Sequence, residues 1–225
     1  MTSLVLAILF FLALHVLVSG TALRGAIIER IGTRAYLGLF SLLSLVGILW
    51  MVRGYRHAPL VPLWAPLPGG RPLTFVLTLL GFLLVVVGLT SPSPTVVGAE
   101  AQIERGDPVR GILRITRHPF LWGVALWALA HLLVNGDLAS ALLFGTFFVL
   151  ALLGPSLIDR RKQALGASWQ RFAASTSSVP FAAIASGRNT LELGELGAWR
   201  VALGLGLFAV FLAVHGRLFG VSPFW

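Results

Sequence analysis

The sequence predicts an all-α, polytopic integral membrane protein, a helical bundle of about six transmembrane helices. Three observations support this fold class. Of the 225 residues, 57% are hydrophobic and only 11% are charged, and the mean hydropathy is +0.90. A soluble domain carries roughly 25% charged residues, so most of this surface must face lipid. The apolar residues are gathered in long segments, and the basic residues are distributed very unevenly between the connections.

Six apolar segments approach the roughly 20 residues that a crossing helix needs. They are Ser3–Thr21, Tyr36–Val52, Leu73–Leu89, Pro119–Val134, Leu138–Leu157 and Trp199–Leu218. The fourth segment is short, and we expect it to gain a turn from the loop before it. The first is expected to remain in the protein, because no basic side chain precedes it as in a secretory signal. One domain spanning residues 1–225 is predicted.

The basic residues predict the orientation in the membrane. Thirteen of the 17 lysines and arginines lie in the connections after the first, third and fifth segments, and four lie on the other side. The positive-inside rule therefore puts the thirteen in the cytoplasm and both termini outside the cytoplasm. The formal net charge of +9 is explained by anionic lipid, and a nucleic-acid partner is not expected.

Two connections have a recognisable character. Residues 54–72 are rich in proline and aromatic residues, which predicts an irregular lid along the outer face. On the cytoplasmic side, one loop carries Glu100, Glu104 and Asp107. In a second cytoplasmic segment, Trp169, Phe172 and Ala173 recur at helical spacing, and we expect this helix to dock on the lipid surface rather than to contact a substrate.

Histidines within apolar segments are the strongest candidates for a site. His15 lies in the first segment and His131 in the fourth, and a histidine in hydrocarbon is costly unless it is paired, ligated or next to a cavity. Such an imidazole can ligate haem iron, bind another metal, relay protons or only pack against its neighbours. Counting along the helices puts the two histidines at depths that differ by on the order of 10 Å.

A second candidate site lies where the fourth segment begins. Pro119 suits the first turn of a helix, whose free N–H groups would point to the cytoplasm beside Arg114, Arg117 and His118. This predicts an anion site, with a basic collar that only orients the helix as the alternative. The chain has no cysteine, which excludes thiolate ligation within it. No pair of zinc ligands at i, i+4 and no nucleophile elbow is found.

Several motifs resemble the NnrU family of bacterial membrane proteins from end to end. They include LHVLVSGTALRG, IGTRAYLGLFSLLSL, SPSPTVVGAEA, GILRITRHPFLWGVALWALAHLLVNGD, SSVPFAAIASGRN and LFGVSPFW. The resemblance implies a location in the bacterial inner (cytoplasmic) membrane. It also implies a link to denitrification, that is, to nitrite and nitric-oxide reduction, with denitrification proteins as partners.

The chain is also similar to the 15-cis-zeta-carotene isomerases, which hold haem b and isomerise a polyene double bond. This resemblance implies haem b as cofactor, with His15 and His131 as ligands of the haem iron, and a lipophilic small molecule as substrate. A cysteine of those enzymes near the second histidine is replaced by Ala128.

A weaker similarity reaches the isoprenylcysteine and phospholipid methyltransferases, through Gly111, Arg114, the Arg117-His118-Pro119 run and Gly123, followed downstream by Trp169, Phe172 and Pro180. It implies binding of S-adenosylmethionine. An acidic pair of those enzymes is replaced by Asp159-Arg160. The sequence therefore leaves three functions open: a haem-dependent isomerase or redox protein, a methyltransferase, or a non-catalytic accessory protein of a denitrification complex.

Overall fold

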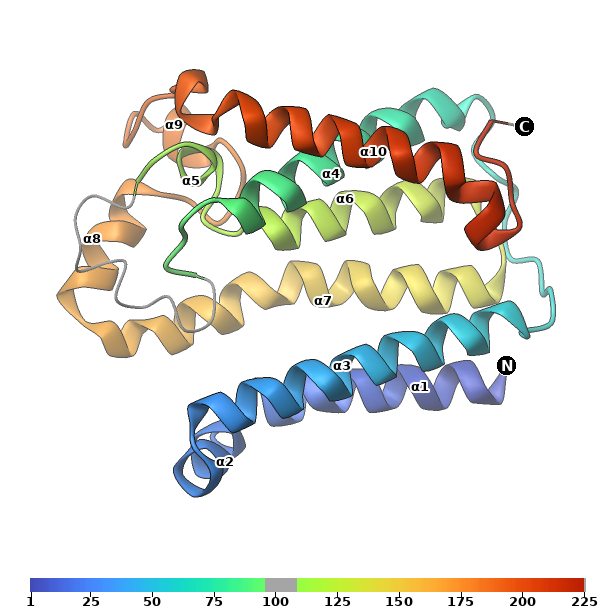
Figure 1. Cartoon of the computed structure of the whole chain (residues 1–225), viewed down its shortest axis with the longest axis horizontal. Coiled ribbons are helices and arrows are strands. Elements are labelled where there is room, and N and C mark those ends of the chain that lie inside the picture. The colour runs from blue at the N-terminus through green and yellow to red at the C-terminus, as the bar shows by residue number, and fades with distance from the viewer. Residues whose placement is uncertain (96–108, 225) are drawn as a thin grey trace. The chain divides into compact units, whose positions relative to one another are not determined.

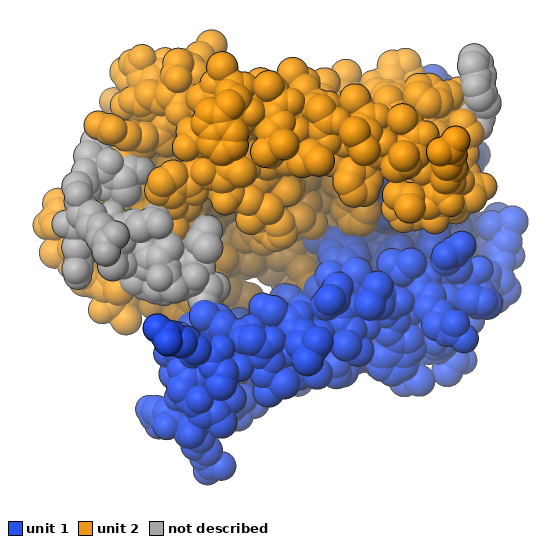
Figure 2. Space-filling model, in the orientation of Figure 1, with its two compact units in different colours: residues 1–70, 131–147 blue, residues 71–130, 148–225 orange. Residues whose placement is uncertain are grey.

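The computed structural model describes residues 1–95 and 109–224, and this part of the chain is helical apart from its connections and one isolated β-bridge. The predicted loop acids Glu100, Glu104 and Asp107 lie outside the described residues. The chain divides into two compact units, coloured separately in Figure 2. Unit 1 comprises Met1–Gly70 and His131–Phe147, and unit 2 comprises Arg71–Ala130 and Phe148–Trp225.

Unit 1 begins with α1 (Thr2–Leu12), which continues into a π-helical segment, η1 (Ala13–Val18). A bend of 83° separates this stretch from α2 (Leu23–Ile31). The long helix α3 (Thr33–Arg56) then runs back beside α1 (Figure 1). Unit 1 also contains the end of α6 (Pro119–Val134) and the start of α7 (Leu138–Lys162), so the boundaries between the units fall within these two helices.

Small residues on α3 allow α1 to approach closely. A Cβ atom at Gly54 would lie 2.8 Å from the backbone of Leu4, and one at Gly47 would lie 3.2 Å from the Phe11 ring. Leu4 and Phe11 are buried on one face of α1, seven residues apart, as the period of an amphipathic helix requires. Glycine-lined contacts of this kind are common between helices in membranes, where packing replaces the hydrophobic effect.

The proline-rich connection of unit 1 packs on the turn between α6 and α7. Leu63 and Trp64 both donate backbone hydrogen bonds to the carbonyl of Gly136, at 2.7 and 3.1 Å. Leu138 donates a backbone hydrogen bond to the carbonyl of Val61 at 2.9 Å. The connection is therefore fixed to this turn of unit 1, and its role as a lid stays a prediction.

Unit 2 contains α4 (Gly70–Thr90), most of α6, the end of α7 and α10 (Ala198–Phe219). Short helices join them, namely α5 (Ile112–Ile115), η3 (Gln163–Leu165), α8 (Ala167–Ser175), α9 (Ala182–Ala185) and η4 (Leu193–Leu196). Helices α4 and α6 meet backbone to backbone, because a Cβ atom on Gly81 would lie 2.8 Å from the carbonyl of Gly123. Gly88 is similarly close to Pro119.

The expected docking of α8 on lipid is wrong. Trp169 and Phe172 are 3% and 2% exposed, and they belong to a core cluster with Val87 and the residues of α5. The reason is that α5, which the sequence did not predict, presents Ile112, Leu113 and Ile115 as an apolar surface for α8 within the protein.

All six predicted apolar segments are helical, and the chain is a multi-pass membrane protein. Helices α3, α4, α7 and α10 are long and apolar enough to cross a bilayer, and the bent stretch from Thr2 to Ile31 is a fifth candidate. Helix α6, with 16 residues, is shorter. It does not gain the expected turn, because Thr116 is extended and α6 begins at Pro119.

Candidate functional site

His15 lies within the π-helical segment η1, where Ser19 donates its N–H to the carbonyl of Leu14, five residues back. Such segments are rare and are found disproportionately at functional sites. The Nδ1 atom of His15 is 2.9 Å from the carbonyl oxygen of Phe11. A carbonyl can only accept, so Nδ1 carries the proton and the neutral ring keeps its lone pair on Nε2. The local backbone thus presets Nε2 as a ligand atom.

Aromatic rings surround His15. Its imidazole lies 4.1 Å from the ring centroid of Phe11 and 5.1 Å from that of Phe40 on α3. Phe11 in turn contacts Phe147 on α7 at 5.6 Å. These ring contacts hold the half-buried imidazole in one orientation.

His131 lies in the same unit as His15. Its ring stacks on Phe144 with centroids 4.6 Å apart, and its backbone carbonyl accepts bonds from both nitrogens of Asn135. Phe144 and Phe147 are one helical turn apart on α7; His131 stacks on the first, and His15 is connected to the second through the Phe11 ring. The predicted difference in depth between them stays a prediction.

Next to Phe144, a chain of hydrogen bonds links Tyr55, Ser140 and Asp137. Ser140 is fully buried, and its hydroxyl lies 2.5 Å from a carboxylate oxygen of Asp137 and 2.9 Å from the Tyr55 hydroxyl. Because an ionised carboxylate only accepts, Ser140 donates to Asp137 and must accept from Tyr55. Sequence reasoning missed this hydrogen-bond network, although the protein has only two tyrosines and both lie on α3.

Two of the three unsatisfied buried polar atoms in the described residues lie on α3, the helix whose Phe40 contacts His15. In residues 1–95 and 109–224, the buried side-chain atoms without a hydrogen-bond partner are Tyr36 Oη, Ser44 Oγ and Asn189 Oδ1. Tyr36 and Ser44 flank Phe40 on one face of α3, at intervals of four residues. Buried polar groups are nearly always bonded, so two exceptions on the face that contacts His15 call for an explanation.

The predicted anion ligands Arg117 and His118 lie together in unit 2, and both bind Asp159 of α7. Arg117 donates to both carboxylate oxygens, with the shortest distance 2.5 Å, and His118 Nε2 donates to one oxygen at 2.8 Å. The His118 side chain is 1% exposed. Sequence reasoning noted Asp159 only as a departure from another family's motif. Its position as a lone carboxylate at the end of an apolar helix was a signal that it needs a cation.

Arg114, the third predicted anion ligand, binds Glu195 with distances of 2.8 and 3.2 Å. Gly111 adds a backbone bond to Glu195 at 2.8 Å, which its positive φ of 55° makes possible. These bonds from Arg114 and Gly111 lower the pKa of the Glu195 carboxyl from 4.5 to about 2. All three side chains are therefore bound to carboxylates of the protein, with which an external anion would compete, and the anion site stays a prediction.

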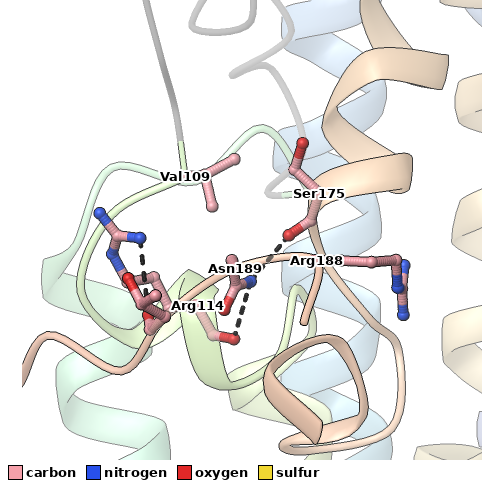
Figure 3. Close-up of a pocket in the computed structure, with 6 residues that line it drawn as sticks. Val109, Arg114, Ser175, Arg188 and Asn189 are labelled. Atoms are coloured by element: carbon pink, nitrogen blue, oxygen red, sulfur yellow. Dashed lines mark hydrogen bonds between the residues drawn. The ribbon is translucent and has the colours of Figure 1, made fainter. Parts of the chain in front are cut away.

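A small polar pocket of about 240 Å³ lies beside Arg114 (Figure 3). It is lined by Val109, Arg114, Ser175, Arg188, Asn189 and Thr190. Asn189 bridges the pocket walls, because its amide donates to the carbonyls of Ser175 and Arg114 at 2.7 and 3.3 Å. Its own carbonyl oxygen is buried and has no hydrogen-bond partner among residues 1–95 and 109–224. The side chains of Arg114 and Arg188 extend on opposite sides of it.

The other two histidines serve local structure. His57, at the end of α3, donates to the carbonyl of Arg53, and His215 on α10 donates to the carbonyl of Val221. In the described part of the chain, no group of three or more histidine, aspartate or glutamate side chains could hold a metal ion together.

Comparison with known proteins decides the family. Residues 3–223 match the family described as NnrU protein, which is nearly the whole chain. The protein belongs to the NnrU family. The match confirms the family resemblance that the sequence motifs indicated.

Two curated relatives of this NnrU-family chain are chloroplast enzymes. The 15-cis-zeta-carotene isomerases of Arabidopsis thaliana and Zea mays are 39% and 38% identical to it over 82 residues. These residues make up 36% of this chain and 22% of each relative, so the chain spans about a fifth of their length. No solved structure matches the chain.

Proposed function

We propose that unit 1 binds haem b through His15 and His131, and that the protein is a haem-dependent isomerase of a lipophilic substrate in the bacterial inner membrane. The proposal rests on the tautomer of the His15 imidazole. Its proton is committed to the Phe11 carbonyl, which leaves Nε2 as an electron-pair donor inside an apolar, aromatic environment. The similarity to the two isomerases supports the type of reaction.

The donor set fits a haem b. Neutral imidazole is a common axial ligand of haem iron, and a helical bundle supplies such ligands from facing helices. His15 and His131 lie in one unit on different helices, and each is held by phenylalanine rings that are compatible with an apolar macrocycle.

When bound, haem b supplies an iron centre that can exchange one electron or act as a Lewis acid. The chain's own residues do the rest. The Phe11 carbonyl holds the tautomer of His15, while Phe40 and Phe144 hold the imidazole planes and exclude water. The large apolar side chains of α3, among them Leu42, Leu45 and Leu49, are widely exposed and give unit 1 a surface compatible with a lipophilic molecule.

The first experiment is an absorption spectrum of the detergent-purified protein, oxidised and dithionite-reduced, with a pyridine haemochrome assay. We expect a haem b spectrum that is lost in His15→Ala and His131→Ala. His57→Ala is the matched control, because His57 makes the same bond to a carbonyl four residues back but lies exposed at a helix end. A colourless wild-type protein, or full pigment in both histidine variants, contradicts the proposal.

A link to denitrification is the second part of the proposal, and it rests on the family. The same haem could serve nitrogen-oxide reduction, or the protein could assist a denitrification complex without catalysis. A strain that lacks the protein would then reduce nitrite or nitric oxide more slowly, and His15→Ala would fail to restore the rate if the haem is required. Full restoration by His15→Ala would favour the accessory role instead.

Methyl transfer from S-adenosylmethionine is the alternative function, and the pocket beside Arg114 favours it. The pocket is polar, and the unpartnered Asn189 carbonyl could accept a bond from an amino group. Binding of labelled S-adenosylmethionine that is lost in Asn189→Ala would support this function. Absence of binding in membranes that retain the folded protein would eliminate it.

A further inference from the structure

Tyr36 carries a buried hydroxyl that lacks a partner. The residue is 4% exposed, and its Oη makes no hydrogen bond within residues 1–95 and 109–224. Burying a hydroxyl without replacing its bonds to water is unfavourable, so the sequence gains nothing from an oxygen here unless something else binds it. A phenylalanine would fill the same space.

A cation lies over the ring that carries this hydroxyl. The guanidinium carbon of Arg24 is 5.5 Å from the centroid of the Tyr36 ring. Arg24 is in the first turn of α2, and the 83° bend after η1 brings it back toward the start of α3. The ion pairs found in the described residues involve Arg114, Arg117 and His118, and Arg24 forms none with their carboxylates.

The Arg24–Tyr36 pair is connected to His15 through one ring. Tyr36 stacks on Phe40 with centroids 5.9 Å apart, and Phe40 meets the His15 imidazole at 5.1 Å. The pair is on the loop side of His15, at the end of unit 1 that the positive-inside rule assigns to the cytoplasm. A ligand held by His15 would thus have a cation and a phenol at its edge on the membrane boundary.

We propose that Arg24 and Tyr36 bind a carboxylate of the group that His15 ligates, namely a propionate of haem b. This inference rests on the proposed function. Haem b has two propionates on one edge of an otherwise apolar ring, and a carboxylate next to hydrocarbon must be paired or hydrogen-bonded. The guanidinium matches carboxylate geometry, and the phenol adds a third donor, which satisfies the orphaned oxygen.

The test compares two probes, haem b and its dimethyl ester, which lacks the carboxylates. The purified full-length apoprotein is titrated with each, and binding is followed by the Soret band. We expect the wild type to bind haem b roughly ten- to hundredfold more tightly than the ester, the range for hydrogen bonds to a charged group. In Arg24→Ala this preference should approach one, and in Tyr36→Phe it should fall part of the way, with unchanged affinity for the ester in both.

Arg30→Ala is the matched control, since Arg30 is an exposed arginine on the same helix and should keep the full preference. Thermal unfolding of the apoprotein separates binding from structure. If the hydroxyl awaits a ligand, Tyr36→Phe should leave the apoprotein as stable as wild type or more so. Lower apoprotein stability would indicate a structural role and overturn the proposal.

The outcomes also separate this proposal from the proposed function. Tight binding of both probes with no preference for haem b, or a preference that Arg24→Ala leaves intact, overturns the carboxylate site while haem binding stands. Failure of the wild type to bind either probe contradicts haem binding itself, and the carboxylate site falls with it.

Discussion

Asp159 should be one of the most sensitive positions for stability in unit 2. It receives bonds from Arg117 Nε and Nη2 and from His118 Nε2, at distances from 2.5 to 3.1 Å. The Arg117 and Asp159 side chains are only 14% and 19% exposed, so solvent screens the pair weakly. The substitution Asp159→Asn keeps the shape of the side chain and removes its charge, which leaves the Arg117 guanidinium buried without a counterion.

The expected cost follows from that burial. Removing one partner of a buried ion pair costs about 3–5 kcal/mol, whereas removing a partner of an exposed pair costs less than about 1 kcal/mol. The side-chain oxygen of asparagine can still accept a bond, so we expect the loss in unfolding free energy to be at the lower end of this range, about 3 kcal/mol. For a chain of this length, that lowers the midpoint of thermal unfolding by roughly 6–12 °C.

Thermal unfolding in detergent, followed by circular dichroism, measures this effect. Glu192→Gln is the control, because Glu192 is an exposed carboxylate whose loss should shift stability by less than about 0.5 kcal/mol. A double-mutant cycle with Arg117→Gln should show a coupling energy above about 0.5 kcal/mol. Equal midpoints for Asp159→Asn and Glu192→Gln would refute the reasoning.

Three further predictions concern other positions. Gly136→Ala should destabilise unit 1 by about 1–3 kcal/mol, because a Cβ atom would collide with the Trp64 carbonyl, whereas Gly145→Ala, with open space around it, should be neutral or stabilising in the same melts. Glu195 has a pKa of about 2 in the folded protein against 4.5, so its contribution is complete above pH 4.5 and is lost as the pH falls toward 2. Melts of wild type and Glu195→Gln should therefore converge at low pH, and a constant gap would contradict the assignment. Loss of pigment in His15→Ala and His131→Ala, with His57→Ala unchanged, is checked by the absorption spectra described above.

The sequence predicted the helical fold because hydrocarbon imposes a simple rule on the chain. A segment of about 20 apolar residues has no other stable structure in a bilayer, so all six helices could be located from composition. The same rule could not locate α5, which has four residues and no membrane-length signal. Missing α5 led to the wrong environment for Trp169 and Phe172, since helical spacing identifies an apolar face but not what covers it.

The sequence likewise predicted the histidines of the candidate site but not the residues that contact them. His15 and His131 stand out because histidine is rare in apolar helices, and the structure puts both in unit 1. Their phenylalanine neighbours could not be predicted, because one phenylalanine among many in a membrane helix carries no signal. The partners Asp159 and Glu195 lie 42 and 81 residues from their arginines, a separation that only the folded chain closes.

The π-helical segment has a consequence for how this chain can change. A π-helical turn is an α-helix with one residue too many, and it is less stable than the regular helix that a one-residue deletion would restore. Such a deletion would also turn the following side chains by about 100° relative to those before them, and His15 is among the residues affected. Stability and the orientation of the imidazole therefore oppose each other in these six residues. Selection for stability alone would remove the extra residue, whereas selection for the orientation of His15 would retain it.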